Sequence, residues 1–255
     1  MEELKIALVQ STIKWHNPDL NFDHTRELVL GIDETDLILL PEMWASGFTM
    51  QVHKNHQYTE KGLTLMHDFA RHHSALVGGS LITKVGDKYY NRFYLVSADE
   101  VVATYDKKHL FAYAGEDRYF TSGRDQVVIE YNNWKLSLNV CYDLRFPVWT
   151  RNTSDYDILI YSANWPDKRI DAWDALLPAR AIENQCFVLG TNCFGEDAWH
   201  NTYAGHSQAI GPDGKIISKL VGQSGVIQVT LVKKILETYR EHLPFLKDRD
   251  LFEFK

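Results

Sequence analysis

Apolar and polar residues along the chain follow two spacings, and each spacing predicts one kind of element. Short apolar runs, several of them alternating with polar positions, predict strands that are buried on one or both faces. Apolar residues that recur every three or four positions predict helices between these strands. The strand pattern occurs at residues 5–10, 36–44, 75–80, 91–98, 101–107, 126–132, 135–140, 157–165, 187–192, 207–212 and 225–231.

The helical pattern occurs at residues 21–33, 59–73, 147–152, 171–185 and 231–244. It is clearest in the second segment, where Leu63, Met66 and Phe69 share one helical face. Pro178 has no backbone N–H, so we expect it to divide the fourth segment into two helical pieces. The tail 247–255 mixes charged and aromatic residues, which is typical of a segment that either docks on a neighbour or frays.

The order of these elements indicates an α/β fold. Strands alternate with helices in the first part of the chain, and the Asp99-Glu100 and Asn132-Asn133 turns add hairpins. This mixture predicts a sandwich in which helices cover buried mixed sheets. No repeat, low-complexity stretch or Pro/Gly-rich linker divides the 255 residues, so we expect a single domain over 1–255.

Composition and charge exclude several classes of function. A net charge of −7 argues against nucleic-acid binding, which needs a basic face. No apolar run approaches the length of a membrane span, and the N-terminal residues enter a strand pattern directly. The three cysteines, Cys141, Cys186 and Cys193, do not form a disulfide framework. We therefore expect a cytoplasmic protein without membrane or nucleic-acid partners.

The segment 135–149 shows the sharpest change from apolar to polar residues. Leu136, Leu138 and Val140 form one face of the predicted strand, and the chain turns polar directly after Cys141. A helix starting near Pro147 would point its N-terminal dipole at this thiol and favour the nucleophilic thiolate. Taken alone, a cysteine at a strand end is more often inert packing.

Two other strands end in the same way. Glu42 follows the apolar run at 36–44, and Lys107 follows the run at 101–107. A carboxylate, a cation and a thiol are what amide or nitrile hydrolysis by thiol attack requires. Taken alone, each residue is better explained without catalysis: Glu42 as a surface carboxylate, Lys107 as part of a solvated lysine pair, and Glu116 as a salt-bridging loop residue.

The sequence around these positions resembles that of the nitrilase superfamily of carbon–nitrogen hydrolases. The matching blocks are PEMWASGFT around Glu42, YDKKHLF around Lys107, NVCYDLRFP around Cys141, and KIALVQ, SANWP and RAIENQ elsewhere. Among the branches, CYDLRFP and the GFTM after the Glu42 block are most similar to the omega-amidases. The resemblance extends across nearly the whole chain.

The resemblance implies a four-layer α-β-β-α sandwich whose subunits pair into a homodimer or a higher homo-oligomer. It also implies that Glu42 is the general base, Lys107 an oxyanion donor and Cys141 the nucleophile that forms a thioester. Glu116 stands seven residues before Gly123, as the second glutamate of the family does, although the text around it departs from the usual pattern. Its implied role is to position Lys107 or the substrate amide.

The substrate pocket is less clear from the sequence. Tyr142 follows the nucleophile and offers its backbone N–H as a second oxyanion donor. Asn164 and Trp165 end the strand at 157–165, and the resemblance places them in the pocket wall. Arg145 suits a substrate carboxylate, but an ion pair with Asp143 or another structural carboxylate is the preferred explanation. Aromatic candidates for the pocket or the core are Phe48, Tyr113 and Phe146.

We expect neither a metal nor a cofactor. The histidines are concentrated early in the chain, but their spacing matches no known ligand pattern. They are His53, His56, His67, His72 and His73. His109 lies inside the Lys107 block, where we expect it to support the loop through hydrogen bonds.

The function that the resemblance implies is hydrolysis of the omega-amide of small dicarboxylic acid monoamides, such as 2-oxoglutaramate or 2-oxosuccinamate. Ammonia would leave and a cysteine thioester would form. The alternatives are another small-molecule hydrolase of the same superfamily, a carbamoylase or a nitrilase, and a non-catalytic interaction module with the same fold. A papain-like protease needs a histidine base downstream of an early cysteine, whereas Cys141 lies mid-chain.

Overall fold

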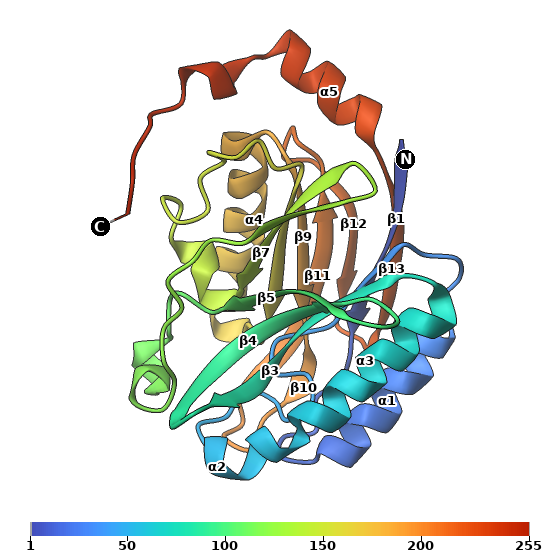
Figure 1. Ribbon diagram of the computed structural model, residues 1–255, viewed down its shortest axis with the longest axis vertical. Helices are drawn as coiled ribbons and strands as arrows, with labels where there is room; N and C mark the ends of the chain where they lie inside the picture. Colours follow the sequence, from blue (N-terminus) through green and yellow to red (C-terminus); the bar gives the residue numbers. More distant parts are fainter. Residues whose placement is uncertain (1, 255) are drawn as a thin grey trace.

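Two sheets face each other at the centre of the molecule, and helices cover both outer faces (Figure 1). The computed structural model describes residues 2–254 of the chain. The layers run helix, sheet, sheet, helix, which confirms the predicted α-β-β-α sandwich. None of the helices in the described range is long and apolar enough to cross a membrane.

The first sheet combines parallel and antiparallel strands. In spatial order it contains β13 (Gly225–Val232), β1 (Glu3–Gln10), β2 (Leu37–Leu39), β3 (Leu76–Val85), β4 (Lys88–Val96) and β5 (Val101–Asp106). The sequence of β1 is almost continuously apolar because both faces of the strand are buried. Ile6 and Leu8 point into the core between the sheets, while Ala7 and Val9 contact the core under the outer helices.

Helices α1 (Pro18–Leu30) and α3 (Thr59–His73) cover the outer face of this sheet (Figure 1). The side chain of Asn17 accepts a hydrogen bond from the Leu20 N–H and caps the start of α1. Helix α3 has the predicted bounds and buries Met66 and Phe69. Burial of such side chains contributes about 1.5–3 kcal/mol each, which attaches the helix to the sheet.

The second sheet carries the strand that ends at Cys141. In spatial order it contains β10 (Phe194–Glu196), β11 (Thr202–Ile210), β9 (Phe187–Asn192), β8 (Ile158–Ala163), β7 (Trp134–Val140) and β6 (Val128–Tyr131), and β12 (Ile216–Val221) pairs with β11. Asn132 and Asn133 have φ values of 50° and 67°, which confirms the predicted tight hairpin. Strands β10 and β12 were not predicted.

Helix α4 (Ile170–Asn184) covers the outer face of the second sheet without interruption. The predicted break at Pro178 is therefore wrong. Trp173 and Leu177 are fully buried against the sheet, so tertiary packing outweighs the loss of one helical hydrogen bond. Gly190 permits this contact, because a Cβ there would lie 2.7 Å from Leu177 and 2.8 Å from Trp173.

The predicted helix at 147–152 is also wrong. The chain instead forms a 3-10 helix at Cys141–Arg145 and then turns. The Trp149 indole donates to the Tyr105 hydroxyl and the Trp149 carbonyl accepts from Gln126, and these long-range bonds hold the turn. The remaining short helices are α2 (Val52–Asn55) and 3-10 helices at His56–Tyr58, Ala112–Ala114, Glu116–Arg118, Asp167–Arg169 and Phe245–Asp248.

Helix α5 (Lys233–His242) crosses one end of the sandwich, and the C-terminal segment then runs along its side (Figure 1). Leu236 is the buried residue of α5, and Arg240 pairs with Asp157, which directly precedes β8. Near the end of the tail, the Phe254 ring lies 5.0 Å from that of Trp149. Lys255, the last residue of the predicted tail, lies outside the described residues.

Candidate active site

The candidate catalytic residues follow strands of both sheets. Glu42 follows β2 and Lys107 follows β5 in the first sheet, whereas Cys141 follows β7 and Asn164 follows β8 in the second. Backbone contacts join the sheets here, because the Glu42 N–H donates to the Ala163 carbonyl at 3.4 Å. The structure thus brings together the strand ends that the sequence singled out.

A buried ionic cluster lies behind the thiol. Lys107 Nζ donates to Glu42 Oε1 at 2.7 Å and to Glu116 Oε2 at 2.9 Å and Oε1 at 3.1 Å. None of the three side chains is more than 1% exposed. The Phe111 N–H donates to Glu116 Oε2 at 2.6 Å and fixes that carboxylate. One cation thus lies between two carboxylates, and all three side chains are shielded from bulk solvent.

Asn91 belongs to this cluster and was missed by the sequence analysis. Its Nδ2 donates to Glu42 Oε1 at 2.7 Å and to Glu116 Oε1 at 3.1 Å. The side chain is fully buried on β4, next to the segment that carries Lys107. In the sequence, Asn91 is a single amide residue at the start of an apolar strand, and no pattern links this residue with Glu42.

The second oxygen of Glu42 faces the other sheet. Asn164 N–H donates to Glu42 Oε2 at 3.0 Å, and the Asn164 side chain donates to the Glu42 carbonyl. The Cys141 thiol contacts the Asn164 carbonyl at an Sγ–O distance of 3.9 Å. Glu42 is therefore held by partners from both sheets, and the same Asn164 backbone contacts the thiol.

Cys141 adopts an unusual backbone conformation. Its φ is 44°, in the left-handed region that L residues other than Asn and Asp rarely occupy. The residue opens the 3-10 helix that places Tyr142 next to it. Because this helix has only five residues and there is no helix at 147–152, the expected helix dipole that favours the thiolate is absent from this part of the described chain.

The electrostatics of the cluster favour a protonated thiol. Burial raises the pKa of Cys141, the negative charge of Glu42 raises it further, and Lys107 opposes this effect. Burial alone would lower the pKa of Lys107, but Glu116 and Glu42 outweigh burial and raise it. Burial also raises the pKa of Glu116. The structure thus favours a thiol at Cys141, where the sequence predicted a thiolate.

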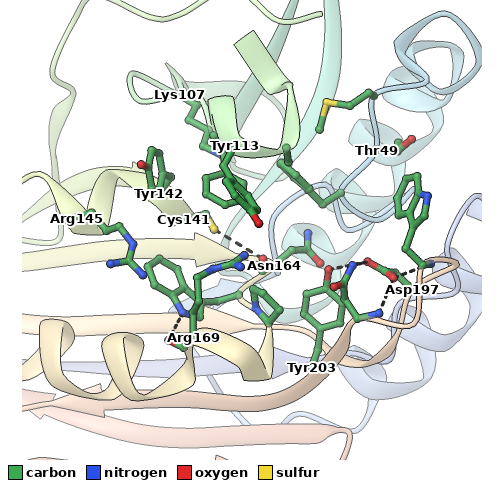
Figure 2. A pocket seen from close by; sticks show the side chains of 18 of the residues that line it. Thr49, Lys107, Tyr113, Cys141, Tyr142, Arg145, Asn164, Arg169, Asp197 and Tyr203 are labelled. Atoms are coloured by element: carbon green, nitrogen blue, oxygen red, sulfur yellow. Dashed lines mark hydrogen bonds between the residues drawn. The ribbon is translucent and has the colours of Figure 1, made fainter. Parts of the chain in front are cut away.

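Cys141 and Lys107 open onto a cavity of about 340 Å³ (Figure 2). The predicted pocket residues Tyr142, Arg145, Asn164 and Trp165 all line it. Phe48 and Tyr113 also line it, and Tyr113 is 89% exposed, so it is not a core residue. Phe146 is not among the lining residues described. Its ring stacks on His109 with centroids 3.7 Å apart.

Two arginines line the same cavity (Figure 2). The Arg145 guanidinium lies 4.9 Å from the centroid of the Trp165 ring, and that of Arg169 lies 5.0 Å from the Phe111 ring. Within residues 2–254, neither forms an ion pair. The expected ion pair of Arg145 with Asp143 or another structural carboxylate is therefore wrong. Arg169 was missed because its segment showed no strand end or family block.

The early histidines make hydrogen bonds to protein groups. His53 contacts the Tyr89 hydroxyl at 2.9 Å, His67 the Ser97 carbonyl at 2.7 Å and His73 the Val29 carbonyl at 2.9 Å. His56 bonds to a carbonyl within α2, and the His72 ring lies against His73. No group of three or more His, Cys, Asp or Glu side chains in the described range is arranged to hold a metal ion.

Comparisons with known proteins agree with this geometry. The chain is 40% identical over 253 residues to omega-amidase YafV of Escherichia coli (strain K12), covering 99% of both chains. It is 33% identical over 257 residues to 2-oxoglutaramate amidase of Bacillus subtilis (strain 168), covering 97% of this chain and 98% of the relative.

A solved structure is also similar throughout. XC1258 from Xanthomonas campestris, a CN-hydrolase superfamily protein with an arsenic adduct in its active site, has a TM-score of 0.97 and 33% identity over 100% of both chains. The family model for carbon-nitrogen hydrolases matches residues 5–241. With the sandwich fold and these relatives, the chain belongs to the carbon–nitrogen hydrolase family, the nitrilase superfamily.

Proposed function

We propose that the protein is a thiol omega-amidase. It hydrolyses the terminal amide of small dicarboxylic acid monoamides, such as 2-oxoglutaramate or 2-oxosuccinamate, and releases ammonia without a cofactor. The observation that carries the proposal is that one cavity holds both Cys141 and the guanidinium groups of Arg145 and Arg169, which form no ion pair within residues 2–254. The similarity to an omega-amidase and a 2-oxoglutaramate amidase supports the same reaction.

In the first half of the reaction, Glu42 acts as general base. As the Cys141 sulfur attacks the amide carbon, the thiol proton passes to Glu42 and the C=O electron pair moves onto oxygen. Lys107 Nζ and the Tyr142 N–H stabilise this oxyanion. When the carbon–nitrogen bond breaks, Glu42 returns the proton to nitrogen, ammonia leaves and a thioester remains. The raised pKa of the Cys141 thiol supports this role for the base.

In the second half, water replaces ammonia. Glu42 takes a proton from the water as its oxygen attacks the thioester, and the same donors hold the second oxyanion. The carbon–sulfur bond then breaks, and the thiolate regains the proton from Glu42. Glu116 and Asn91 position Lys107 and Glu42 through the buried contacts described above, so that one carboxylate serves both halves.

Arg145 and Arg169 recognise the free carboxylate of the substrate. Guanidinium groups bind carboxylates through parallel N–H bonds, and stacking of each on an aromatic ring limits its movement. An amino acid such as glutamine adds an ammonium group at the same end of the substrate. Its positive charge would lie near both arginines, so we expect the 2-oxo acid amides to be preferred.

Ammonia release from a panel of substrates tests the proposal. The panel contains 2-oxoglutaramate, 2-oxosuccinamate, glutarate monoamide, glutamine, a simple nitrile and a carbamoyl amino acid. Preference for the three monoamides would support an omega-amidase. Activity only on the nitrile or the carbamoyl compound would assign another reaction to the same cysteine, and a fully inactive panel would favour a non-catalytic module.

We further propose that residues 1–255 act as one domain in a cytoplasmic homodimer. Pairing of β1 with β13, from opposite ends of the sequence, supports a single folding unit. The buried free thiols support a reducing compartment. Exposed Ile182 on α4 and Leu251 in the tail offer apolar surface to a second subunit. Light scattering that shows a monomer at micromolar concentration would contradict the dimer.

A further inference from the structure

Asp143 is a fully buried carboxylate that the reaction above does not use. Its Oδ2 accepts hydrogen bonds from the Tyr105 hydroxyl at 2.7 Å and from the Val140 N–H at 3.0 Å. Its Oδ1 lies 2.9 Å from the His109 backbone nitrogen, which donates to it, and 2.8 Å from His109 Nδ1. A buried carboxylate with this many partners is fixed in position.

These partners flank two of the proposed catalytic residues. Tyr105 lies two residues before Lys107, and His109 lies two residues after it. Val140 directly precedes Cys141. Strand β5 belongs to the first sheet and β7 to the second, so the Asp143 carboxylate joins the two backbone segments that carry the cation and the nucleophile.

Further contacts hold the hydrogen-bond partners of this carboxylate in place. The Tyr105 hydroxyl accepts a hydrogen bond from the Trp149 indole at 3.0 Å. The His109 ring is stacked on Phe146, with only 5° between their planes. The bond from the Val140 N–H fixes the carboxylate to the end of β7.

We propose that Asp143 is a positioning residue that sets the placement of Lys107 Nζ relative to the Tyr142 N–H. These two groups are the donors assigned to the oxyanion, so the inference rests on the proposed function. Asp143 touches no substrate; it acts through the segments of Tyr105, His109 and Val140. Loss of the carboxylate should impair the step that builds the oxyanion and leave substrate binding intact.

The test compares Asp143→Asn with a matched buried carboxylate, Asp157→Asn. Asp157 is 4% exposed and accepts bonds from the Lys135 N–H, Lys233 and Arg240, away from the cavity. We expect Asp143→Asn to lower kcat for 2-oxoglutaramate about 100-fold or more, with KM changed less than about threefold. Asp157→Asn should lower the melting temperature but keep kcat within about threefold of wild type.

Alkylation of Cys141 by iodoacetamide distinguishes an effect on the two oxyanion donors from an effect on the thiol. This reaction forms no oxyanion, so its rate reports the reactivity of the thiol alone. We expect Asp143→Asn to keep the alkylation rate within about threefold of wild type. An unchanged kcat, a parallel loss of alkylation, or an equal loss of kcat in Asp157→Asn would overturn the proposal.

If Asp143→Asn does not fold, Tyr105→Phe removes one partner and keeps the carboxylate. It should lower kcat about tenfold with KM unchanged, and an unchanged kcat would overturn the proposal. A wild-type protein that is inactive on the whole panel would defeat the proposed function and this inference with it. An active wild type with an unaffected Asp143→Asn would defeat the inference alone.

Discussion

Lys107 Nζ lies 2.7 Å from Glu42 Oε1, although the two residues are 65 positions apart in the sequence. Both side chains are shielded from water, and Glu116 occupies the other side of the ammonium. A buried ion pair of this kind adds little net stability, but removal of one partner is costly because the other charge remains buried. Substitution of a residue in this cluster should therefore affect both the stability of the fold and the proposed reaction.

Lys107→Met should lower the free energy of unfolding by about 3–5 kcal/mol near neutral pH. Burial already raises the pKa of Glu116, and without the cation its ionised form is penalised further. This penalty is absent below the unfolded pKa of about 4.5 and grows as pH rises through the folded value. Urea unfolding should therefore show a larger loss at about pH 8 than at about pH 5.

Lys61→Met is the control for that experiment, because Lys61 pairs with Asp19 on the surface. It should leave stability almost unchanged at both pH values. A Lys107→Met loss that does not depend on pH would show that uncompensated carboxylates are not its cause.

Cys141→Ala should lower ammonia release by at least about 10⁴-fold, since the thioester can no longer form. Circular dichroism should show an unchanged fold. Cys186→Ala is the matched control, because Cys186 is also a buried free thiol but does not line the cavity. Turnover by the Cys141 variant at a rate near that of the control would rule out the covalent mechanism.

Glu42→Gln should change turnover and thiol reactivity in opposite directions. Loss of the proposed general base should lower kcat about 10²–10⁴-fold. Burial still raises the pKa of Cys141 in this variant, but the further increase due to the Glu42 charge is removed. The pH midpoint of iodoacetamide alkylation should thus move down, with Glu34→Gln on the surface as control. An unchanged or higher midpoint would contradict this electrostatic account.

Arg145→Gln and Arg169→Gln should each lower kcat/KM for 2-oxoglutaramate about 10- to 100-fold, because each removes a charge-assisted hydrogen bond. Butanamide lacks the carboxylate, so its hydrolysis should change little. The exposed Arg71→Gln serves as control. Equal losses on both amides would indicate a structural role for the arginines, and no loss on either would place the carboxylate elsewhere.

Much of the fold could be predicted because its elements depend on local patterns. Helix α3 has the predicted bounds, and both faces of β1 are buried as its apolar run indicates. The errors arose where tertiary contacts overrule local preference. Pro178 stays within α4 because the helix is anchored by buried Trp173 and Leu177, and the segment after Cys141 is held by a distant tyrosine.

The residues of the candidate site also fall into those that local sequence predicts and those that it does not. Glu42, Lys107 and Cys141 stand at strand ends within recognisable blocks, so their proximity could be expected. Asn91 and Arg169 could not be predicted, because their place in the site depends on contacts with residues far away in the sequence. Asn91 contacts Glu42, and Arg169 lies over the Phe111 ring. The protonation of the thiol depends on burial and on the Glu42 charge, and neither can be read from residue order.

Because the proposed base and cation follow strands of one sheet and the nucleophile follows a strand of the other, neither sheet is competent alone. A partly folded chain with a single completed sheet holds either a carboxylate and an ammonium or a thiol. Catalysis thus starts only when the two halves have docked. Turnover during refolding would therefore report the completion of the native state, and a newly synthesised chain would carry no active hydrolytic cysteine before that point.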